Sequence, residues 1–373
     1  MRTTPAKALK LLHTASTAEL MALADDRRRA LHGRSTYYVH SFNLNPTNLC
    51  ENRCKLCAFW RDRGAAGAYV LPIEHARRTL KRARGLKLTE LHIVGGIIPE
   101  LNLEYYDKLL RLAKDILPGV LIQGMTAVEI RWLADRAKIP VRAVLKRLQE
   151  AGLDAVSGGG AEIFAEKVRR RICPKKISAA EWLSVHETAH ELGIPTNATM
   201  LFGHIETDED VVDHLSRLRA LQDRTGGFRA FIPLPFHAGG TALGVPRGPA
   251  GDRIARVTAL SRIFLDNVPH VRMLVNYVDR KLLGALTHGG VDDIGGTSVD
   301  ERIAKAAGAP DAHRFSSPGE MDGFIRALGL APVLTNSAYA GTRAAKKAGR
   351  GAPCLAILAE AAAGRRLTAR EAL

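Results

Sequence analysis

The stretch that decides the fold is Tyr37-Tyr38-Val39-His40-Ser41-Phe42-Asn43-Leu44, which leads through five residues into Cys50-Glu51-Asn52-Arg53-Cys54-Lys55-Leu56-Cys57. The first part is apolar enough to predict a buried strand, and the second part places three thiols at spacings of four and three. Only 5 cysteines occur in 373 residues, so three of them on one short stretch depart strongly from chance scatter. We therefore expect a strand that carries a cysteine-bearing loop at its carboxyl end.

Three thiolates on one loop can hold a metal ion or an iron–sulfur cluster. An Fe–S cluster normally takes four thiolates, so a loop with three leaves one iron for water, substrate or another side chain. Structural zinc requires a closed ligand shell and usually shows a second ligand pair at matched spacing. The sequence has no such pair, although Cys173 or a distant histidine could supply one ligand through folding. Three buried or disulfide-bonded cysteines are disfavoured, because neighbours on one loop cannot easily all pair or all be buried.

Composition and charge narrow the class of protein. With 46% hydrophobic and 25% charged residues, the chain has the make-up of a globular protein. It has neither an apolar run long enough to span a membrane nor a secretory signal core, so we expect a cytoplasmic protein with no membrane span. The net charge of +16 could attract nucleic acid, but aromatic residues are only 5% and do not alternate with the basic residues as stacking platforms would. Solvated helix faces and attraction of small anionic substrates explain the charge better, and no nucleic-acid partner is expected.

Strand-like and helix-like segments alternate along most of the chain. The expected strands are 37–44, 91–94, 120–125, 154–157, 196–202, 228–234, 271–277 and a short one near 291–294; the expected helices between them are 72–83, 103–114, 141–151, 179–192, 208–222 and 254–265. Parallel strands joined by helices form right-handed βαβ units. Seven or eight such units predict an α/β fold, a complete or partial (β/α) barrel of the TIM type. We expect an N-terminal helical cap over residues 1–35, the barrel over 36–330, and a flexible connection with a helical tail over 331–373.

Chemically informative residues follow the expected strands. The cysteine loop follows the first strand, Gly95-Gly96 the second, Thr126 and Glu129 the third, Gly158–Glu162 the fourth, His204 the fifth and His237 the sixth. In a parallel barrel the carboxyl ends of all strands meet at one face, where active sites lie. The convergence of these turns at one face is stronger evidence for an active site there than any single motif.

Each of these residues also has a simpler interpretation. Gly95-Gly96 could bring backbone groups against the carboxylate and ammonium of an amino acid, yet tight turns explain glycine pairs equally often. Glu162 after a glycine turn suits ribose hydroxyls, although a solvated side chain on a glycine-permitted bend explains it nearly as well. His204 and His237 are candidate bases or substrate donors, while single histidines more often have a structural role.

Arginines and the remaining cysteines allow fewer conclusions. Arg61 and Arg63 follow the cysteine loop and could clamp a carboxylate in bidentate fashion. Arg169-Arg170-Arg171 could do the same, although a run of charge is usually a solvated face. Cys173 is better explained as a structural thiol, and Cys354 carries no sign of function.

The cysteine spacing after the first strand of a barrel resembles the radical S-adenosylmethionine superfamily. This resemblance implies a [4Fe-4S] cluster on Cys50, Cys54 and Cys57, with the open iron chelated by the amino and carboxylate groups of S-adenosylmethionine (SAM). It further implies that one-electron reduction cleaves the C5′–S bond of SAM and gives a 5′-deoxyadenosyl radical.

Further stretches resemble the aminofutalosine synthase family of the futalosine route to menaquinone. They are Asn43–Cys50, Cys57-Ala58-Phe59, Gly67-Ala68-Tyr69, His92–Gly96, Thr126–Ile130, Gly158–Phe164, Arg169–Pro174, Asn197–His204 and Phe231–His237. They follow the motif order of the family over roughly residues 36–310. One departure is Leu56, which stands where many superfamily members place an aromatic residue beside the adenine.

The implied reaction adds the 5′-deoxyadenosyl radical to the enol ether of 3-[(1-carboxyvinyl)oxy]benzoate. The adduct then rearranges by attack on the arene and loses carboxylate to give 6-amino-6-deoxyfutalosine. The implied partners are this small dicarboxylate and a reductant such as flavodoxin or ferredoxin. By resemblance, Gly95, Gly96, Glu162 and Phe59 contact the cofactor, Arg61, Asn197 and Thr126 contact the substrate, and His204 and His237 are the catalytic candidates.

Two alternatives remain open. A cyclic dehypoxanthine futalosine synthase, or one half of the deazaflavin F0 synthase, would share cluster and barrel but use the radical to abstract hydrogen. Gly67-Ala68-Tyr69 and Arg171-Ile172-Cys173-Pro174 favour the aminofutalosine synthase family. A zinc-binding nucleic-acid module is the remote alternative, and the strand–helix alternation argues against it.

Overall fold

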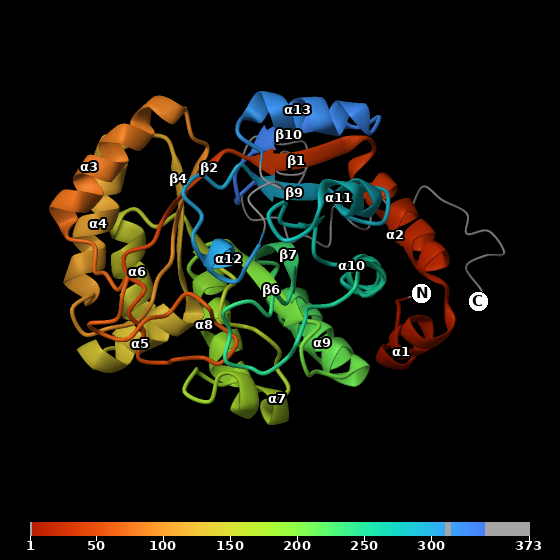
Figure 1. Cartoon of the computed structure of the whole chain (residues 1–373), viewed down its shortest axis with the longest axis horizontal. Helices are drawn as coiled ribbons and strands as arrows, with labels where there is room; N and C mark the ends of the chain where they lie inside the picture. The colour runs from red at the N-terminus through yellow and green to blue at the C-terminus, as the bar shows by residue number, and fades with distance from the viewer. Residues whose placement is uncertain (1, 310–314, 340–373) are drawn as a thin grey trace.

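A parallel seven-stranded sheet forms most of the molecule in the computed structural model, which describes residues 2–309 and 315–339 (Figure 1). Its strands are adjacent in chain order: β2 (Ser41–Leu44), β3 (Glu90–Ile93), β4 (Leu121–Thr126), β5 (Ala155–Ser157), β6 (Thr196–Phe202), β7 (Phe228–Pro235) and β8 (His270–Val271). Every pairing in this sheet is parallel. This sequential parallel order is what βαβ units in a barrel produce.

A three-stranded sheet closes the gap between the first and last of these strands. It has the order β10-β1-β9, with β1 (Ser35–Val39), β9 (Asp293–Gly296) and β10 (Ala331–Thr335). The strand β1 runs into β2 across His40, and Arg272, next to β8, forms a parallel bridge with Asp293 of β9. The predicted TIM-type barrel is therefore confirmed, with β9 as its expected eighth strand.

Helices surround the sheet on its outer side (Figure 1). They are α1 (Pro5–Thr14), α2 (Thr17–His32), α3 (Ile73–Ala83), α4 (Leu103–Ile116), α5 (Ala127–Ala137), α6 (Val141–Ala151), α7 (Glu166–Ile172), α8 (Ala179–Glu191), α9 (Asp208–Thr225), α10 (Gly251–Phe264), α11 (Arg280–Thr287), α12 (Ile303–Ala306) and α13 (Pro318–Ala327). The two expected N-terminal helices pack beside the barrel, α1 against α9 and α10, and α2 against α10. No helix among the described residues is long and apolar enough to cross a membrane.

Alternation along the strands separates the barrel interior from the helix-facing core. On β6, Ala198, Met200 and Phe202 belong to the main hydrophobic core. Successive side chains of a strand point to opposite faces, so Asn197 and Thr199 face the barrel interior. Along β6 the interior face therefore carries two polar side chains and Leu201, whereas the face toward the helices is apolar.

The expected element boundaries differ from the structure in a few places. The strand expected over 271–277 ends at Val271, and the backbone turns at Leu274, whose carbonyl accepts a hydrogen bond from Tyr277 N–H. The segment after Val271 is buried but is not a strand. An apolar sequence indicates burial and does not distinguish a buried strand from a buried turn. The expected helices over 5–35 are confirmed. The tail expected over 331–373 begins with β10, which pairs with β1; Cys354 and the part of that tail after residue 339 lie outside the described residues.

Candidate active site

The cysteine loop lies at the carboxyl end of β2, as expected. Cys54 is only 4% exposed, Cys50 and Cys57 are half-buried, and all three are free thiols. The turn is compact, because Cys57 N–H donates to the Cys54 carbonyl at 3.1 Å and Trp60 Nε1 donates to the same oxygen at 3.1 Å. Burial raises the pKa of the Cys54 thiol to about 12, and it also raises the pKa of Cys57. Thiolates here therefore need a cationic partner.

Arg61, predicted to bind substrate, lies within the cysteine loop. Its Nη1 donates to the carbonyls of Ala58 and Trp60, each at 2.8 Å, and more weakly to that of Phe59 at 3.4 Å. The guanidinium therefore satisfies loop carbonyls in this conformation. Phe59, predicted to contact the cofactor, is buried within the same loop. Arg63 forms an exposed ion pair with Glu100.

The glycine pair after β3 packs directly against the cysteine loop. Gly96 N–H donates to the Thr47 carbonyl at 3.0 Å, and Glu51 N–H donates to the Ile97 carbonyl at 3.0 Å. A Cβ atom on Gly96 would lie 1.9 Å from the Leu49 carbonyl oxygen. Glycine is thus required at this position by the close approach of two backbones.

Glu129 is a site residue that the sequence analysis placed only at a strand end. One carboxylate oxygen accepts Gly95 N–H at 3.2 Å and the other accepts Thr126 N–H at 2.6 Å. Thr126, predicted to bind substrate, caps α5, and its hydroxyl accepts Glu129 N–H at 3.3 Å. Burial raises the pKa of Glu129 to about 7. The Thr-x-x-Glu pattern is a capping box, and it is the sequence signal from which both α5 and this carboxylate could have been predicted.

Glu162 forms a nearly buried ion pair with Lys176, a residue that sequence reasoning missed. The two side chains are 12% and 13% exposed. Glu162 has a φ of 49°, in the left-handed region that favours glycine. Although burial acts in the opposite direction, the Lys176 ammonium holds the pKa of Glu162 below its ordinary value. Lys176 is also close enough to the thiols of Cys54 and Cys173 to interact with them electrostatically.

The two candidate histidines differ in their surroundings. The His204 side chain is fully buried. Its Nδ1 accepts a hydrogen bond from Ile205 N–H at 2.7 Å and lies 3.0 Å from Glu206 Oε2, and its Nε2 lies 3.2 Å from the Leu201 carbonyl oxygen. Both ring nitrogens of His204 are therefore engaged within its own turn. His237 lines a cavity of about 520 Å³ at the carboxyl end of β7, where its Nε2 lies 3.2 Å from the Tyr277 carbonyl. Of the two, His237 is the one placed at an open cavity.

Asn197, predicted to bind substrate, is a buried amide in the barrel interior. It is 1% exposed, and neither its oxygen nor its nitrogen has a hydrogen-bond partner within the described residues. Gln123 Nε2 on β4 is likewise buried and unpaired there. An unsatisfied buried polar group costs about 1–3 kcal/mol, so such groups normally have a partner. This pair is consistent with a polar molecule inside the barrel.

The donor set fits an iron–sulfur cluster. Three soft sulfur ligands stand on one loop, their burial disfavours uncompensated thiolates, and Lys176 supplies positive charge beside Cys54. Three cysteines leave one iron open for a further ligand.

Comparison with known proteins agrees with this geometry. Residues 44–218 match the family model of the radical SAM superfamily, and residues 225–348 match that of the CofH/MqnC C-terminal region. The chain therefore belongs to the radical SAM superfamily and is an enzyme that uses a [4Fe-4S] cluster and SAM.

Among its relatives are aminodeoxyfutalosine synthases from two bacteria. The Thermus thermophilus protein is 43% identical over 89% of this chain and 90% of its own length. The Streptomyces coelicolor protein is 36% identical over 91% of this chain and 90% of its own length. A third relative, the 5-amino-6-(D-ribitylamino)uracil–L-tyrosine 4-hydroxyphenyl transferase of Methanopyrus kandleri, is 36% identical over 86% of this chain and 88% of its own length.

Solved structures support the fold. Methylornithine synthase (PylB) superposes with a TM-score of 0.71 at 16% identity, covering 91% of this chain and 96% of its own. The hydrogenase maturase HydG from Carboxydothermus hydrogenoformans superposes with a TM-score of 0.72 at 16% identity, covering 91% of this chain and 78% of its own. At this identity the likeness supports the barrel alone.

Proposed function

We propose that the protein is a radical SAM transferase that joins the 5′-deoxyadenosyl group of SAM to 3-[(1-carboxyvinyl)oxy]benzoate and so forms 6-amino-6-deoxyfutalosine for menaquinone biosynthesis. The observation that carries this proposal is the 43% identity to the Thermus aminodeoxyfutalosine synthase over nearly the full length of both chains. When bound, the cluster supplies the electron that releases the adenosyl radical from SAM. A reductant such as flavodoxin or ferredoxin supplies that electron in turn.

Residues of the site support this chemistry. Cys50, Cys54 and Cys57 hold the cluster, and Gly95-Gly96, next to that loop, take the methionyl end of SAM. Glu162, kept ionised by Lys176, accepts hydrogen bonds from the ribose hydroxyls. A barrel lined by strands on all sides excludes water from a reactive radical.

We assign the binding of the organic substrate to residues in the barrel interior and at the cavity after β7. Asn197 carries an amide with free hydrogen-bonding capacity, which suits a carboxylate or ether oxygen of the substrate. His237, at the cavity beyond β7, is the better placed of the two histidines to meet substrate, and His204 holds its turn. The net charge of +16 attracts a dicarboxylate.

A second candidate function is the one that the names of the archaeal relatives describe, transfer of a hydroxyphenyl group from tyrosine to 5-amino-6-(D-ribitylamino)uracil. It is favoured by 36% identity to the Methanopyrus protein and by the CofH/MqnC match over residues 225–348. Cyclic dehypoxanthine futalosine synthase is a further alternative on the same C-terminal match.

The test is product analysis with purified, anaerobically reconstituted and reduced protein. Incubation with SAM and 3-[(1-carboxyvinyl)oxy]benzoate should give, by mass spectrometry, an adduct that contains the adenosyl group. Parallel incubations contain tyrosine with 5-amino-6-(D-ribitylamino)uracil, or dehypoxanthine futalosine. Free 5′-deoxyadenosine without adduct in the first reaction, together with turnover in either parallel one, would refute the proposal. A colourless protein that holds stoichiometric zinc would refute the cluster itself.

Asn197→Asp provides a matched test of the substrate role. It keeps the side-chain size but puts a negative charge where a carboxylate substrate would bind. We expect KM for the benzoate to rise while the SAM-binding affinity stays unchanged.

A further inference from the structure

Exposed basic side chains with no ion-pair partner among the described residues lie on the cysteine loop and at the carboxyl end of α7. Lys55, between two of the cysteines, is exposed, as are Arg170 and Arg171 on α7 and Lys175 just after it. None of these four forms an ion pair within the residues that the structure describes, whereas many other exposed basic side chains do, for example Arg53 with Asp62 at 2.6 Å.

These side chains share one surface because the loop and α7 are joined by their backbones. Lys55 N–H donates to the Ile172 carbonyl at 2.9 Å, so the middle of the cysteine loop is hydrogen-bonded to the carboxyl end of α7. On α7, Val168, Arg169 and Ile172 are buried, and Arg169 donates to the carbonyls of the preceding turn. Arg170 and Arg171 consequently point away from the barrel.

The surface is close to the cysteines. The backbone hydrogen bond joins Lys55, which follows Cys54, to Ile172, which follows Arg171. Adding one Cα–Cα distance of about 3.8 Å on each side of this bond puts the Cα atoms of Arg171 and Cys54 at most about 14 Å apart. Trp60, partly exposed and bonded through Nε1 to the Cys54 carbonyl at 3.1 Å, adds apolar area beside the loop. Small transient interfaces of redox proteins combine a charged rim with a limited apolar centre.

We propose that Lys55, Arg170, Arg171 and Lys175 form the docking surface for an acidic one-electron carrier protein, which delivers the reducing electron to the cluster through the outer side of the cysteine loop. Basic residues in the last turn of α7 also favour its dipole, but this effect does not require Lys55 and Lys175, which lie outside the helix. The proposal rests on the cluster assignment and not on the identity of the organic substrate. The docking proposal can therefore fail while the proposed reaction stands, and the proposed reaction can fail while the docking proposal stands.

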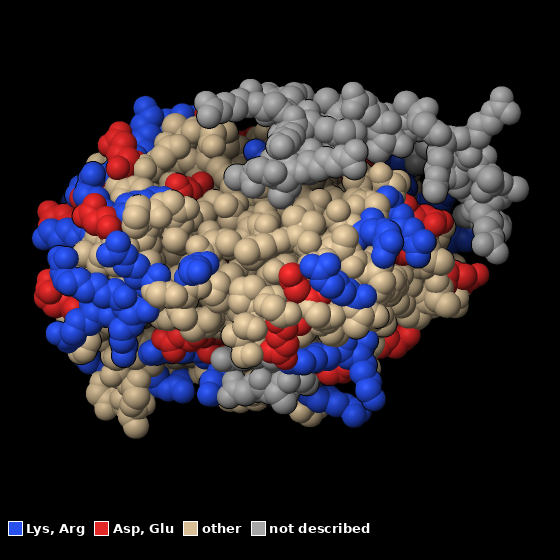
Figure 2. Space-filling model, turned by 90° about the horizontal axis from the view of Figure 1, so that it is seen from above, with Lys and Arg blue, Asp and Glu red and all other residues tan. Residues whose placement is uncertain are grey.

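The chain offers a matched control surface. Arg78, Lys81 and Arg84 are exposed on and just after α3 and form no ion pair among the described residues. Figure 1 places α3 at the left edge of the molecule and α7 at its lower edge, and Figure 2 shows Lys and Arg gathered at the end where α3 and α4 lie. Reversing three charges there changes the net charge as much as reversing three on the docking surface.

The experiment uses the reconstituted full-length protein and flavodoxin as the acidic probe. The variants are the triple Arg170→Glu/Arg171→Glu/Lys175→Glu and the control triple Arg78→Glu/Lys81→Glu/Arg84→Glu. Binding is measured by titration calorimetry, and cluster reduction by stopped-flow absorbance with either flavodoxin or dithionite as reductant. We expect the first triple to weaken flavodoxin binding by about tenfold or more at low ionic strength, to slow reduction by flavodoxin, and to leave reduction by dithionite unchanged. For the wild type, added salt should slow reduction by flavodoxin.

Several results would overturn the proposal. Equal loss of binding in both triples would show a general effect of net charge, and unchanged binding in the first triple would place the carrier elsewhere. A second measurement needs no variant: carbodiimide cross-linking of the wild-type protein to flavodoxin should join Lys55 or Lys175. Cross-links confined to Lys81 or Lys87 would contradict the proposal, as would single-stranded RNA displacing flavodoxin and binding more tightly to the same surface.

Discussion

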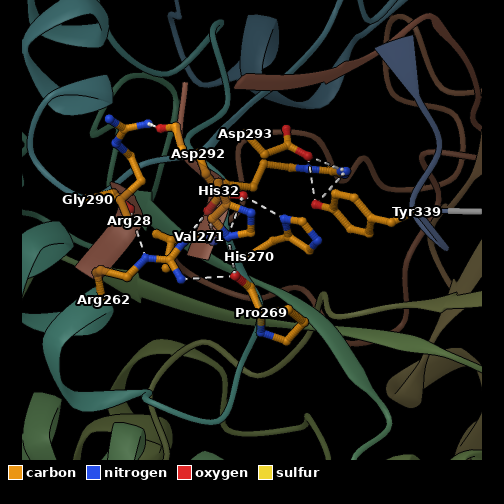
Figure 3. A network of polar contacts seen from close by, with 12 residues as sticks. Arg28, His32, Arg262, Pro269, His270, Val271, Gly290, Asp292, Asp293 and Tyr339 are labelled. Atoms are coloured by element: carbon orange, nitrogen blue, oxygen red, sulfur yellow. Dashed lines mark hydrogen bonds and ion pairs between the residues drawn. The ribbon is translucent and has the colours of Figure 1, made fainter. Parts of the chain in front are cut away.

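Replacing Asp292 by asparagine should be among the most destabilising single changes of charge in this protein. Asp292 is 0% exposed and lies just before β9, at the centre of the polar network in Figure 3. One carboxylate oxygen accepts from the Arg262 guanidinium and from Val271 N–H at 2.8 Å, and the other accepts from His270 Nδ1 at 2.5 Å. The partner cation, Arg262, is itself only 1% exposed.

The magnitude follows from leaving Arg262 buried without its counter-ion. Removing one member of a buried ion pair costs about 3–5 kcal/mol, because the remaining charge has lost its partner but not its desolvation. The neutral amide also places an N–H₂ group where one of several donors now points. We therefore expect Asp292→Asn to lower the free energy of unfolding by about 3–5 kcal/mol.

The assay is urea unfolding followed by circular dichroism, with Asp213→Asn as the matched control. Asp213 pairs with Arg217 on α9 at 2.9 Å, with both side chains 43% exposed, and its loss should cost less than about 1 kcal/mol. The double variant Arg262→Met/Asp292→Leu should recover part of the lost stability, since it leaves no uncompensated charge, while Val271 N–H and His270 Nδ1 lose their acceptor. A loss below about 1 kcal/mol for Asp292→Asn would refute the reasoning.

The same network offers three potential metal ligands, and the structure explains why they need no metal. One ligand atom each from His32, His270 and Asp292 lies within 4.8 Å of the others. However, His32 Nε2 already lies 2.8 Å from the Pro269 carbonyl, and Arg262 occupies Asp292. The positive charge of Arg262 stabilises the carboxylate that a metal ion would otherwise neutralise. The network thus joins α2, α10 and β9 as a structural element.

Three further predictions follow from the site and the core. Cys54→Ser should abolish iron binding after reconstitution, whereas Cys173→Ser should retain it, as measured by iron content and absorbance. Gly96→Ala should also lose iron, because its Cβ would lie 1.9 Å from the Leu49 carbonyl oxygen, while Gly85→Ala, with no atom within 4 Å of the new carbon, should behave as wild type. Burial lowers the pKa of His214 to about 3, so below the ordinary value of about 6.5 the unfolded state binds the proton first and stability falls as pH falls. His214→Gln should therefore reduce the slope of unfolding free energy against pH by about 1.4 kcal/mol per pH unit between roughly pH 4 and 6, and an unchanged slope would contradict this.

Much of the fold could be predicted from periodicity. The ranges 141–151 and 196–202 coincide with α6 and β6, and α9 begins at Asp208, where the helix over 208–222 was expected to begin. The strand expected over 271–277 was too long, because Met273 and Val275 are buried in a turn that follows β8. A buried turn requires the same apolar residues as a buried strand, so the sequence pattern is the same. The helix α5 was missed because its first residues were interpreted as site residues alone.

The candidate site was predictable where chemistry is local in sequence and not where it depends on tertiary contacts. The cysteine spacing and the glycine pair are short-range patterns, and the structure brings them together. The ion pair of Lys176 with Glu162 joins the segment after α7 to the turn after β5, and no spacing rule indicates it. Similarly, the engagement of both His204 nitrogens depends on the path of its own turn, which the sequence does not specify.

The cysteine loop depends on several separate parts of the barrel, and this has a consequence for cluster binding. Glu51 N–H donates to the Ile97 carbonyl after β3, Lys55 N–H to the Ile172 carbonyl of α7, and the Lys55 carbonyl accepts Ala242 N–H from the segment after β7. Segments after three different strands thus hold the loop, so the folded barrel fixes the positions of the three thiols. A ligand that binds the folded state alone stabilises it by mass action, and metal binding is then coupled to folding. Cluster insertion should accordingly stabilise the whole barrel, because the loop that carries the ligands is fixed by contacts around its circumference.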